Sequence, residues 1–322
     1  MGFLNLPNLT AKLQGLFSRE HDSGKRGESK IDGVVASIIE DIYMNQIPHM
    51  TPDVVWDTCR LEIDGEPFYI MWTKDEGFVR VPASKIDFVL ERFSFLGICF
   101  SPDTCFSRCF MIPQGQDAVS YIEEHAPYKR GEYEYSIAEV EYEGRTYAVS
   151  SMLPDIVRVQ YEKTLNRFFI SGGVVVQATD RIFPIASMAG KALGLYEGQS
   201  CIVADFRQHR IGLSAVSFIG GYYVPVCFDV VNMTKDEQGN KEEVSANARL
   251  LAQEVSRQYK LATPERCVVI CPDNEHAIKE FSDKMLACIE GLRSVFQENV
   301  VYMRDDAAPI RGLLMEVGVN EQ

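Results

Sequence analysis

The sequence lacks a long hydrophobic run. None of its 322 residues lies in a stretch of the roughly 18 consecutive apolar residues that a membrane-spanning helix needs. The N-terminus also lacks the charged-then-apolar signature of a secretory signal, and Leu6 stands where an N-myristoylation motif has Ser or Thr. We therefore expect a cytoplasmic protein that has no membrane span of its own.

A basic stripe is missing as well. The 32 Lys and Arg residues are outnumbered by 46 Asp and Glu residues, which gives a net charge of −14. Because nucleic-acid surfaces draw on clustered Lys and Arg, this balance argues against a nucleic-acid partner. The hydrophobic content of 46% and the charged fraction of 24% are typical of a globular chain long enough for two domains.

The cysteines do not form a metal or disulfide pattern. There are nine, an odd number, and they lie mostly within apolar runs, which favours reduced thiols. Cys105 and Cys109, like Cys267 and Cys271, are four positions apart, which is not the spacing of a zinc site, and no paired His is nearby. On a strand such residues simply share a face, so we expect structural thiols and no metal.

The sequence also lacks a common catalytic constellation. Ser214 and Ser217 have no His in their pattern, and "AGKALG" around Lys191 is not a P-loop. The five histidines are scattered along the chain. Acidic clusters such as Glu123-Glu124 are expected to be solvated.

What the N-terminus does contain is an apolar stripe. In "FLNLPNLTAKLQGLF" the residues Leu6, Leu9, Leu13, Leu16 and Phe17 recur at helical spacing, and the polar stretch "SREHDSGKRGESK" follows. We expect residues 1–30 to form a short apolar helix on a flexible linker, and we expect it to bind a partner through Phe3, Leu6, Leu9, Leu13 and Leu16. The alternative is a helix that folds back on the core.

From residue 31 the pattern becomes globular. Apolar periodicity and turn residues predict helices and strands in alternation. In order, we expect a helix over 31–47, a hairpin at Asp64-Gly65, a helix over 83–97, a strand over 105–112, a helix over 117–127, a hairpin at Glu143-Gly144, a helix over 154–169, a strand over 172–180 and a helix over 184–195.

The second half begins with a meander. "CIVADFRQHRIGLSAVSFIGGYYVP" predicts three strands with a turn at Gly220-Gly221. A polar loop over 232–243, a helix capped by Ser245, a strand over 266–271, a helix over 275–296, a strand over 299–303 and a helix over 308–318 follow. Hairpins mixed with crossover helices predict two α/β lobes with mixed sheets, 31–195 and 196–322.

The order of these elements resembles a known family. "CFSRCFMIP" with Arg108, "APYKRGEYEYSIAEVE" with Pro127-Tyr128, "GGVVVQATDRIFPIA" and then the meander, within residues 95–318, are similar to the actin-like assembly proteins of type IV pili. They are also similar to the cytoplasmic part of the type II secretion platform protein. The resemblance implies a two-lobed actin-like (ribonuclease-H-like) fold and a role as a scaffold at the inner membrane.

The same resemblance implies partners. One is a bitopic inner-membrane platform protein whose short cytoplasmic tail lies in a groove between subdomains, and the other is the motor ATPase of the secretion or pilus machine. A protein with these partners acts through protein–protein interaction, and it lies in the cytoplasm, peripheral to the inner membrane.

ATP-binding members of this superfamily use three backbone loops, and the chain departs from each. The second loop resembles Asp-x-Gly, but here Asp205 is followed by Phe206 and Arg207. The Gly-Gly turn of the third loop is replaced by Pro272, Asp273 and Asn274, and the nearest candidate for the first loop, Asp64-Gly65, is typical of an ordinary hairpin. We therefore expect no cofactor and no hydrolysis.

Alternatives remain open. In an active actin-like ATPase, ATP and magnesium would bind, Asp205 would orient the magnesium, and Asp205 and Arg207 would be the cofactor-binding residues. A sugar- or acyl-binding enzyme of the same superfamily would have a catalytic Asp in a polar loop between the lobes. Without nucleotide, we expect Arg207 and Arg210 to project into the cleft and pair with carboxylates of the opposite lobe or of a partner such as the motor.

Overall fold

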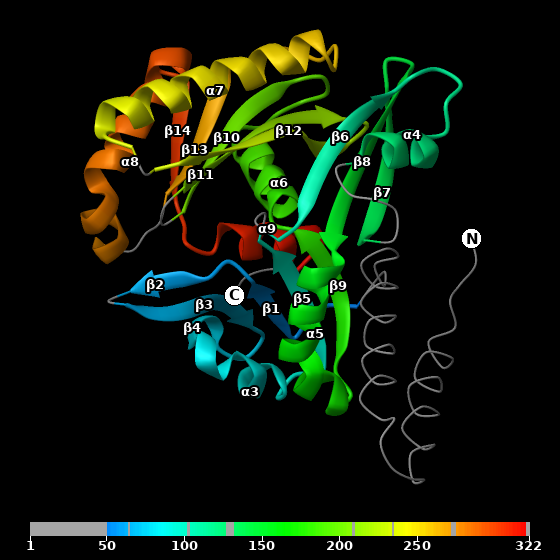
Figure 1. Ribbon diagram of the computed structural model, residues 1–322, viewed down its shortest axis with the longest axis vertical. Coiled ribbons are helices and arrows are strands. Elements are labelled where there is room, and N and C mark those ends of the chain that lie inside the picture. Colours follow the sequence, from blue (N-terminus) through cyan, green and yellow to red (C-terminus); the bar gives the residue numbers. More distant parts are fainter. Residues whose placement is uncertain are drawn as a thin grey trace.

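The computed structural model describes residues 50–63, 65–101, 104–126, 132–207, 210–233, 235–271 and 275–319 (Figure 1). The predicted helices over 3–17 and 31–47 lie outside the described residues, and so do Phe3, Leu6, Leu9, Leu13 and Leu16 of the proposed partner-binding stripe. The same holds for Pro127-Tyr128, His209 and the turn at 272–274.

The first mixed sheet has the strand order β2-β3-β1-β5-β9, with β4 paired to β3. Strands β1, β5 and β9 run parallel, whereas β3 is antiparallel to β1. All four residues of β1 are buried, as expected of a strand covered on both faces. The strands are β1 (Val54–Asp57), β2 (Leu61–Ile63), β3 (Glu66–Thr73), β4 (Gly77–Pro82), β5 (Phe95–Phe100) and β9 (Val174–Asp180).

Helices cover both faces of this sheet. On one face, α3 (Ile86–Leu90) and α5 (Asp155–Ile170) pack on Val54 and Trp56 of β1. On the other, α9 (Ala308–Glu316), which comes from the end of the chain, packs on Val55 through Ile310, Leu313 and Leu314. Alternate residues of β1 therefore contact the helices on opposite faces of the sheet.

The second mixed sheet has the order β12-β11-β10-β13-β14. The predicted meander β10–β11–β12 is antiparallel, and β13 and β14 extend it in parallel to β10. The strands are β10 (Ser200–Arg207), β11 (Arg210–Ile219), β12 (Tyr222–Asn232), β13 (Arg266–Cys271) and β14 (Val300–Arg304). Two α/β units with mixed sheets confirm the predicted fold class, while the boundary at 195/196 stays a prediction.

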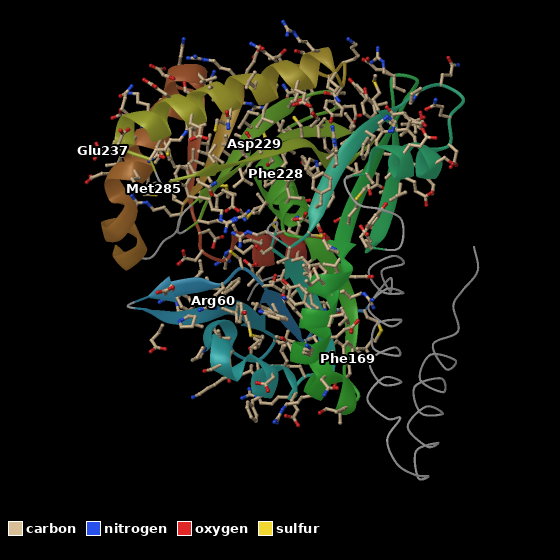
Figure 2. All side chains as sticks on the ribbon, in the orientation of Figure 1. Arg60, Phe169, Phe228, Asp229, Glu237 and Met285 are labelled. Carbon is tan, nitrogen blue, oxygen red and sulfur yellow. The ribbon has the colours of Figure 1, made fainter. Side chains whose placement is uncertain are left out.

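Helices enclose the second sheet too. Val244, Ala248 and Leu251 of α7 (Glu237–Arg257) and Leu292 of α8 (Glu275–Phe296) share a core with Ile202 of β10. On the opposite face, α6 (Ile182–Ala192) packs on the alternate β10 residues Cys201 and Val203. Figure 2 shows side chains filling both cores; Phe169 of α5 and Met285 of α8, labelled there, belong to the first and second core respectively.

A three-stranded antiparallel sheet is inserted between β5 and α5. The strand order of this sheet is β6-β8-β7. The insertion comprises β6 (Phe106–Ile112), the helix α4 (Ala118–His125), β7 (Tyr133–Tyr142) and β8 (Arg145–Pro154). Glu143 and Gly144 both have positive φ, as a type I′ turn requires, which confirms the predicted hairpin.

The inserted sheet is attached to the second lobe. The Tyr147 hydroxyl donates to the Tyr259 carbonyl at 2.8 Å, and the Tyr259 hydroxyl donates back to the Cys109 carbonyl at 3.0 Å. Val140 and Val149 join the same core as β10 and β11. These two buried hydrogen bonds fix the inserted sheet against the second sheet.

Two expected elements were wrong. The helix predicted over 83–97 ends by Leu90, and Phe95–Phe100 forms β5, because this apolar run is buried between β1 and β9. Helix α7 begins at Glu237, where the Asp236 side chain accepts a hydrogen bond from Gly239 N at 2.6 Å. Ser245 is therefore inside the helix, and its hydroxyl contacts that of Ser294 on α8 at 3.0 Å.

The nine cysteines are all free and buried, as expected of structural thiols. In the part of the chain that the structure describes, no group of His, Cys, Asp and Glu side chains is arranged to hold a metal. Among the same residues, every helix is too short or too polar to cross a bilayer.

Replacing Gly312 with Ala should destabilise the protein, although Gly→Ala inside a helix usually stabilises by about 1 kcal/mol. A Cβ at Gly312 would lie 2.1 Å from the Pro184 carbonyl oxygen, because α9 crosses α6 there. We expect a loss of about 1–3 kcal/mol in the free energy of unfolding in urea. Met315→Ala on the same helix, 41% exposed, is the control and should change it by less than about 0.5 kcal/mol. A stabilised Gly312→Ala variant would contradict this helix crossing.

Candidate functional site

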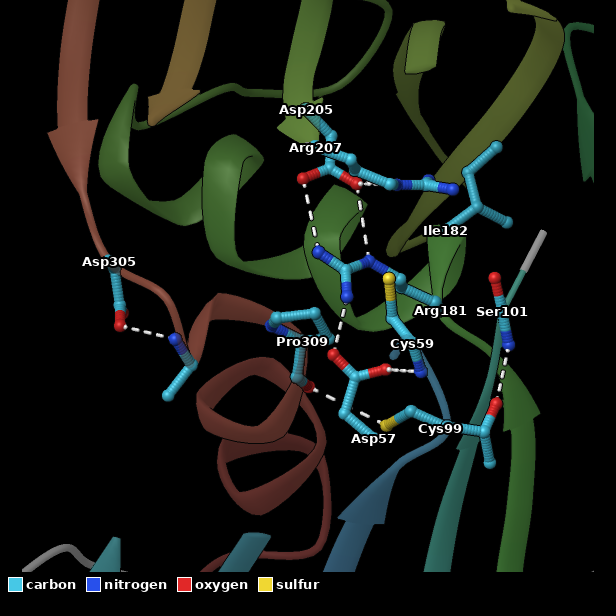
Figure 3. Close-up of polar contacts among 12 residues, drawn as sticks. Asp57, Cys59, Cys99, Ser101, Arg181, Ile182, Asp205, Arg207, Asp305 and Pro309 are labelled. Carbon is cyan, nitrogen blue, oxygen red and sulfur yellow. Dashed lines mark hydrogen bonds and ion pairs between the residues drawn. The ribbon is translucent and has the colours of Figure 1, made fainter. Parts of the chain in front are cut away.

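One arginine connects the two large sheets. Arg181 lies between the end of β9 and the start of α6, and its Nη1 donates to Oδ2 of Asp57, the last residue of β1 (Figure 3). Its Nε and Nη2 donate to Oδ2 and Oδ1 of Asp205 on β10, each at 3.2 Å. The guanidinium thus bridges a carboxylate of the first sheet and a carboxylate of the second, and pairs with Asp205 in the bidentate geometry that suits arginine.

Arg207 contributes a second guanidinium to the same site. Its Nε donates to Asp205 Oδ2 at 2.9 Å, and the residue is only 7% exposed. Gly212 lies opposite Asp205 across the β10–β11 pair, and a Cβ there would be 3.1 Å from Arg207 Nη2. A glycine at 212 thus gives the guanidinium room to fold back along its own strand.

The expected pairing of Arg207 was therefore wrong. We expected Arg207 to project into the cleft and pair with carboxylates of the opposite lobe or of a partner, but it is buried and pairs with Asp205 of its own strand. Residues two positions apart on a strand share a face, so Asp205 is within reach of the Arg207 side chain. It is Arg181 that reaches the opposite lobe.

The charges of this site are almost fully removed from water. Burial raises the pKa of Asp57, and Arg181 only partly opposes that rise. Burial also acts to raise the pKa of Asp205, but Arg181 and Arg207 outweigh it, and the pKa lies below the usual value. The two carboxylates raise the pKa of Arg181 well above that of a free arginine, despite burial. Asp205 is therefore an ionised carboxylate held by two cations.

A further buried carboxylate lies beside the bridge. Asp180 accepts hydrogen bonds from the Ser107 hydroxyl of β6 and from Ile182 N, the latter at 3.0 Å. Burial raises its pKa to about 6. The Ser107 hydroxyl also contacts that of Ser151 at 2.9 Å. Asp180 thus attaches the inserted sheet to the first turn of α6.

Asp57 is not among the residues predicted from the sequence. The candidate there for the first loop is Asp64-Gly65, and Gly65, with φ of 79°, lies in the β2–β3 turn expected of an ordinary hairpin. The residue that faces Asp205 across the bridge is instead Asp57. The available signal was "VVWD", an apolar run that ends in Asp, as "CIVAD" does before Phe206.

The turn after Asp57 uses its polar groups internally. Cys59 N donates to Asp57 Oδ1 at 3.0 Å, and Thr58 Oγ1 accepts from Ser101 N at 2.8 Å and from the Tyr161 hydroxyl at 2.9 Å. A phosphate-binding loop offers main-chain N–H groups to its ligand. Here the Cys59 N–H donates to the Asp57 carboxylate of the same turn.

The contacts of Asp205 oppose magnesium binding at this residue. Both Asp205 oxygens accept hydrogen bonds from guanidinium groups, so a cation coordinated by Asp205 would have to displace Arg181 or Arg207. The expectation that neither ATP nor magnesium binds stays a prediction.

Comparison with known proteins gives a structural likeness and no sequence match. No family profile matches the sequence, and no curated protein matches it. A chain of the PilM–PilN type IV pilus biogenesis complex aligns with a TM-score of 0.53 at 12% identity, covering 85% of this chain and 100% of that chain.

Two further structures are less similar. A Bacteroides thetaiotaomicron protein described as having an actin-like ATPase fold and unknown function has a TM-score of 0.45 at 10% identity, covering 82% of this chain and 96% of that one. The cytoplasmic domain of EpsL, an inner-membrane component of the Vibrio cholerae type II secretion system, has a TM-score of 0.44 at 8% identity, covering 84% and 95%. At 12% identity the likeness to the chain of the PilM–PilN complex shows the fold alone, and this fold agrees with the two-lobed actin-like fold that the sequence predicts.

Replacing Arg181 with Met should destabilise the protein by about 3–5 kcal/mol, because it leaves the carboxylates of Asp57 and Asp205 buried without their shared cation. The measurement is the free energy of unfolding in urea. Arg167→Met is the matched control, since Arg167 is 47% exposed and pairs with Asp87 at 3.3 Å. It should cost about 0–1 kcal/mol. Equal losses in the two variants would show that the bridge does not hold the fold.

Asp180→Asn should change how stability depends on pH. Because the folded-state pKa of Asp180 is about 6, above that of an unfolded-chain Asp, the folded protein holds this proton more tightly. The resulting stability is present at low pH and is lost as pH rises towards 6 and above. Relative to wild type, Asp180→Asn should thus be more stable at pH 8 than at pH 5.5, by about 1 kcal/mol.

The control for this comparison is Asp117→Asn. Asp117 has a lowered pKa, through hydrogen bonds from Ser120, so its titration is complete well below pH 5.5. Its stability difference from wild type should be the same at pH 8 and pH 5.5. If Asp180→Asn behaved like this control in urea unfolding, the carboxyl group of Asp180 would not titrate near 6.

Proposed function

We propose that the chain is a cytoplasmic actin-like scaffold of a type IV pilus or type II secretion assembly platform. In this role it binds a bitopic inner-membrane platform protein and the motor ATPase, and it does so without hydrolysing nucleotide. It lies peripheral to the inner membrane and works through protein–protein interaction.

The observation that carries the proposal is the Arg181 bridge. Actin-like ATPases hold nucleotide between their two lobes, next to loops at the strand ends. In this chain the ends of β1 and β10 are joined there by a guanidinium, and the nearby Asp205 is neutralised by Arg207 as well. Protein side chains thus supply the link between the lobes, which suits a scaffold of fixed shape.

The fold likeness supports the choice of machine and of partner. The aligned structure is a complex of PilM with PilN in type IV pilus biogenesis, and its full chain is covered by this one. By analogy, the cytoplasmic tail of a bitopic platform protein occupies a groove between subdomains of this chain. The apolar stripe Phe3, Leu6, Leu9, Leu13 and Leu16 gives a second partner contact, and the motor ATPase is the other proposed partner.

A second candidate function is an active actin-like ATPase. The observation that favours it is that Asp57 and Asp205, each at the end of an apolar strand, face one site from the two lobes. In that case Arg181 would move when ATP and magnesium bind, and Asp205 would orient the magnesium.

Equilibrium binding of a fluorescent ATP analogue with magnesium separates the two functions. We expect no binding in the micromolar range by the wild-type chain, because Arg181 and Arg207 occupy the oxygens of Asp205. Arg207→Gly should not create ATPase activity, since Arg181 still bridges the lobes. Micromolar magnesium-dependent binding that Asp205→Ala abolishes would put the ATPase first.

A further inference from the structure

Three turns that are distant in the sequence meet at one corner of the molecule. The Glu197 carboxylate, in the loop between α6 and β10, accepts hydrogen bonds from Gly220 N at 2.7 Å and from Gly221 N at 3.4 Å. Gly198 N also donates to the Phe218 carbonyl at 2.8 Å. The loop before β10 is therefore fixed to the β11–β12 turn.

The tip of the β7–β8 hairpin closes the same corner. A Cβ at Gly198 would lie 2.3 Å from the Tyr142 hydroxyl, and one at Gly220 would lie 2.5 Å from Cγ1 of Val140. Both glycines have positive φ, so each turn combines a backbone that favours glycine with close contact to the hairpin. We name this region, formed by residues 140–145, 196–199 and 219–222, the Tyr196–Tyr222 corner.

Two tyrosines are presented to solvent there. Tyr196 precedes Glu197 and Tyr222 follows Gly221, so the two residues flank the groups that the Glu197 hydrogen bonds join. Each is 67% exposed, although Tyr is a residue that proteins concentrate at the centre of interfaces. The corner therefore carries two exposed tyrosines, each next in sequence to a residue that these hydrogen bonds join.

The backbone beneath Tyr196 is held by several hydrogen bonds. Gln199 N donates to the Tyr196 carbonyl at 2.9 Å, and the Gln199 side chain accepts from Arg266 Nη2 at 3.1 Å. Arg266 Nη1 donates in turn to the Leu193 carbonyl at 2.9 Å. Rigid presentation lowers the entropy lost when a ring is immobilised by a partner.

The charge around the rings is negative. The exposed carboxylates of Glu141, Glu143 and Glu197 belong to the three segments. Two guanidinium groups oppose them: that of Arg145 pairs with Glu143 at 3.4 Å, and that of Arg266 contacts the Gln199 side chain. The whole chain carries a net charge of −14. Such a surface repels phosphate groups, and therefore disfavours nucleic acid and anionic lipid, while it attracts Lys and Arg.

We propose that the Tyr196–Tyr222 corner binds a basic peptide segment of a partner protein. Tyrosine faces accept Lys or Arg side chains by cation–π contact and also pack on aliphatic groups, while the carboxylates pair with the remaining positive charges. The ligand is thus an extended segment that mixes Lys or Arg with apolar residues. This site is independent of the Arg181 bridge and of the proposed role in a secretion platform.

Fluorescence anisotropy of the full chain with short labelled peptides tests the proposal. One peptide alternates lysine and leucine, a second glutamate and leucine, and a third serine and leucine. We expect the lysine peptide to bind most tightly, with an affinity that falls as salt is added. Replacing both Tyr196 and Tyr222 with Ser should weaken its binding by roughly tenfold or more.

Two further variants keep the test sharp. Tyr302→Ser removes an exposed tyrosine from β14, at the opposite edge of the second sheet from β12, and should leave the affinity within about twofold. Glu143→Lys should weaken binding of the lysine peptide and strengthen that of the glutamate peptide. No binding of the lysine peptide, equal binding of all three peptides, or an equal loss in Tyr302→Ser would overturn the proposal.

Discussion

The relative placement of the two lobes depends on one buried guanidinium. Arg181 pairs with Asp57 of the first sheet and with Asp205 of the second, and all three side chains are buried. Removing an ion from water costs several kcal/mol unless its partners compensate, so none of these groups can leave the others cheaply. Separating the lobes would break at least one of the two carboxylate pairs that Arg181 makes. The bridge therefore opposes the hinge motion by which many two-lobed proteins close on ligands.

Two other contacts also join parts of the fold that are distant in sequence. The inserted sheet contacts the second lobe through Tyr147 and Tyr259, and it contacts the start of α6 through Ser107 and Asp180. Each contact lies at a different place in the fold and joins segments far apart in the chain. The crossing of α6 and α9 adds a further contact between these parts of the fold.

The sequence allowed much of this fold to be predicted, because its signals are local. The Glu143-Gly144 hairpin and the meander from β10 to β12 follow from turn residues and alternation within a few positions. The predicted helix was extended to residue 97, into β5, because a short apolar run has the same composition in a helix and in a buried strand. The parallel neighbours of β5 are distant in sequence.

The site was predicted only in part. Asp205 was identified from its place at the end of an apolar run, but its partner Arg181 carries no motif, and Asp57 is 124 residues from Arg181. The orientation of Arg207 depends on a glycine across the β10–β11 pair, which no pattern along one strand reveals. Pairings of this kind are set by tertiary contacts, so periodicity and turn chemistry cannot give them.

The position of α9 also sets an order of events during synthesis. One face of the first sheet, with Val55, Ile70 and Trp72, is covered by Ile310, Leu313 and Leu314 from the end of the chain. A ribosome makes the strands of that sheet long before it makes α9, so the nascent first lobe exposes this apolar face while the whole second lobe is translated. The chain therefore has a long interval in which a chaperone can bind that face, and a product truncated before α9 keeps it exposed.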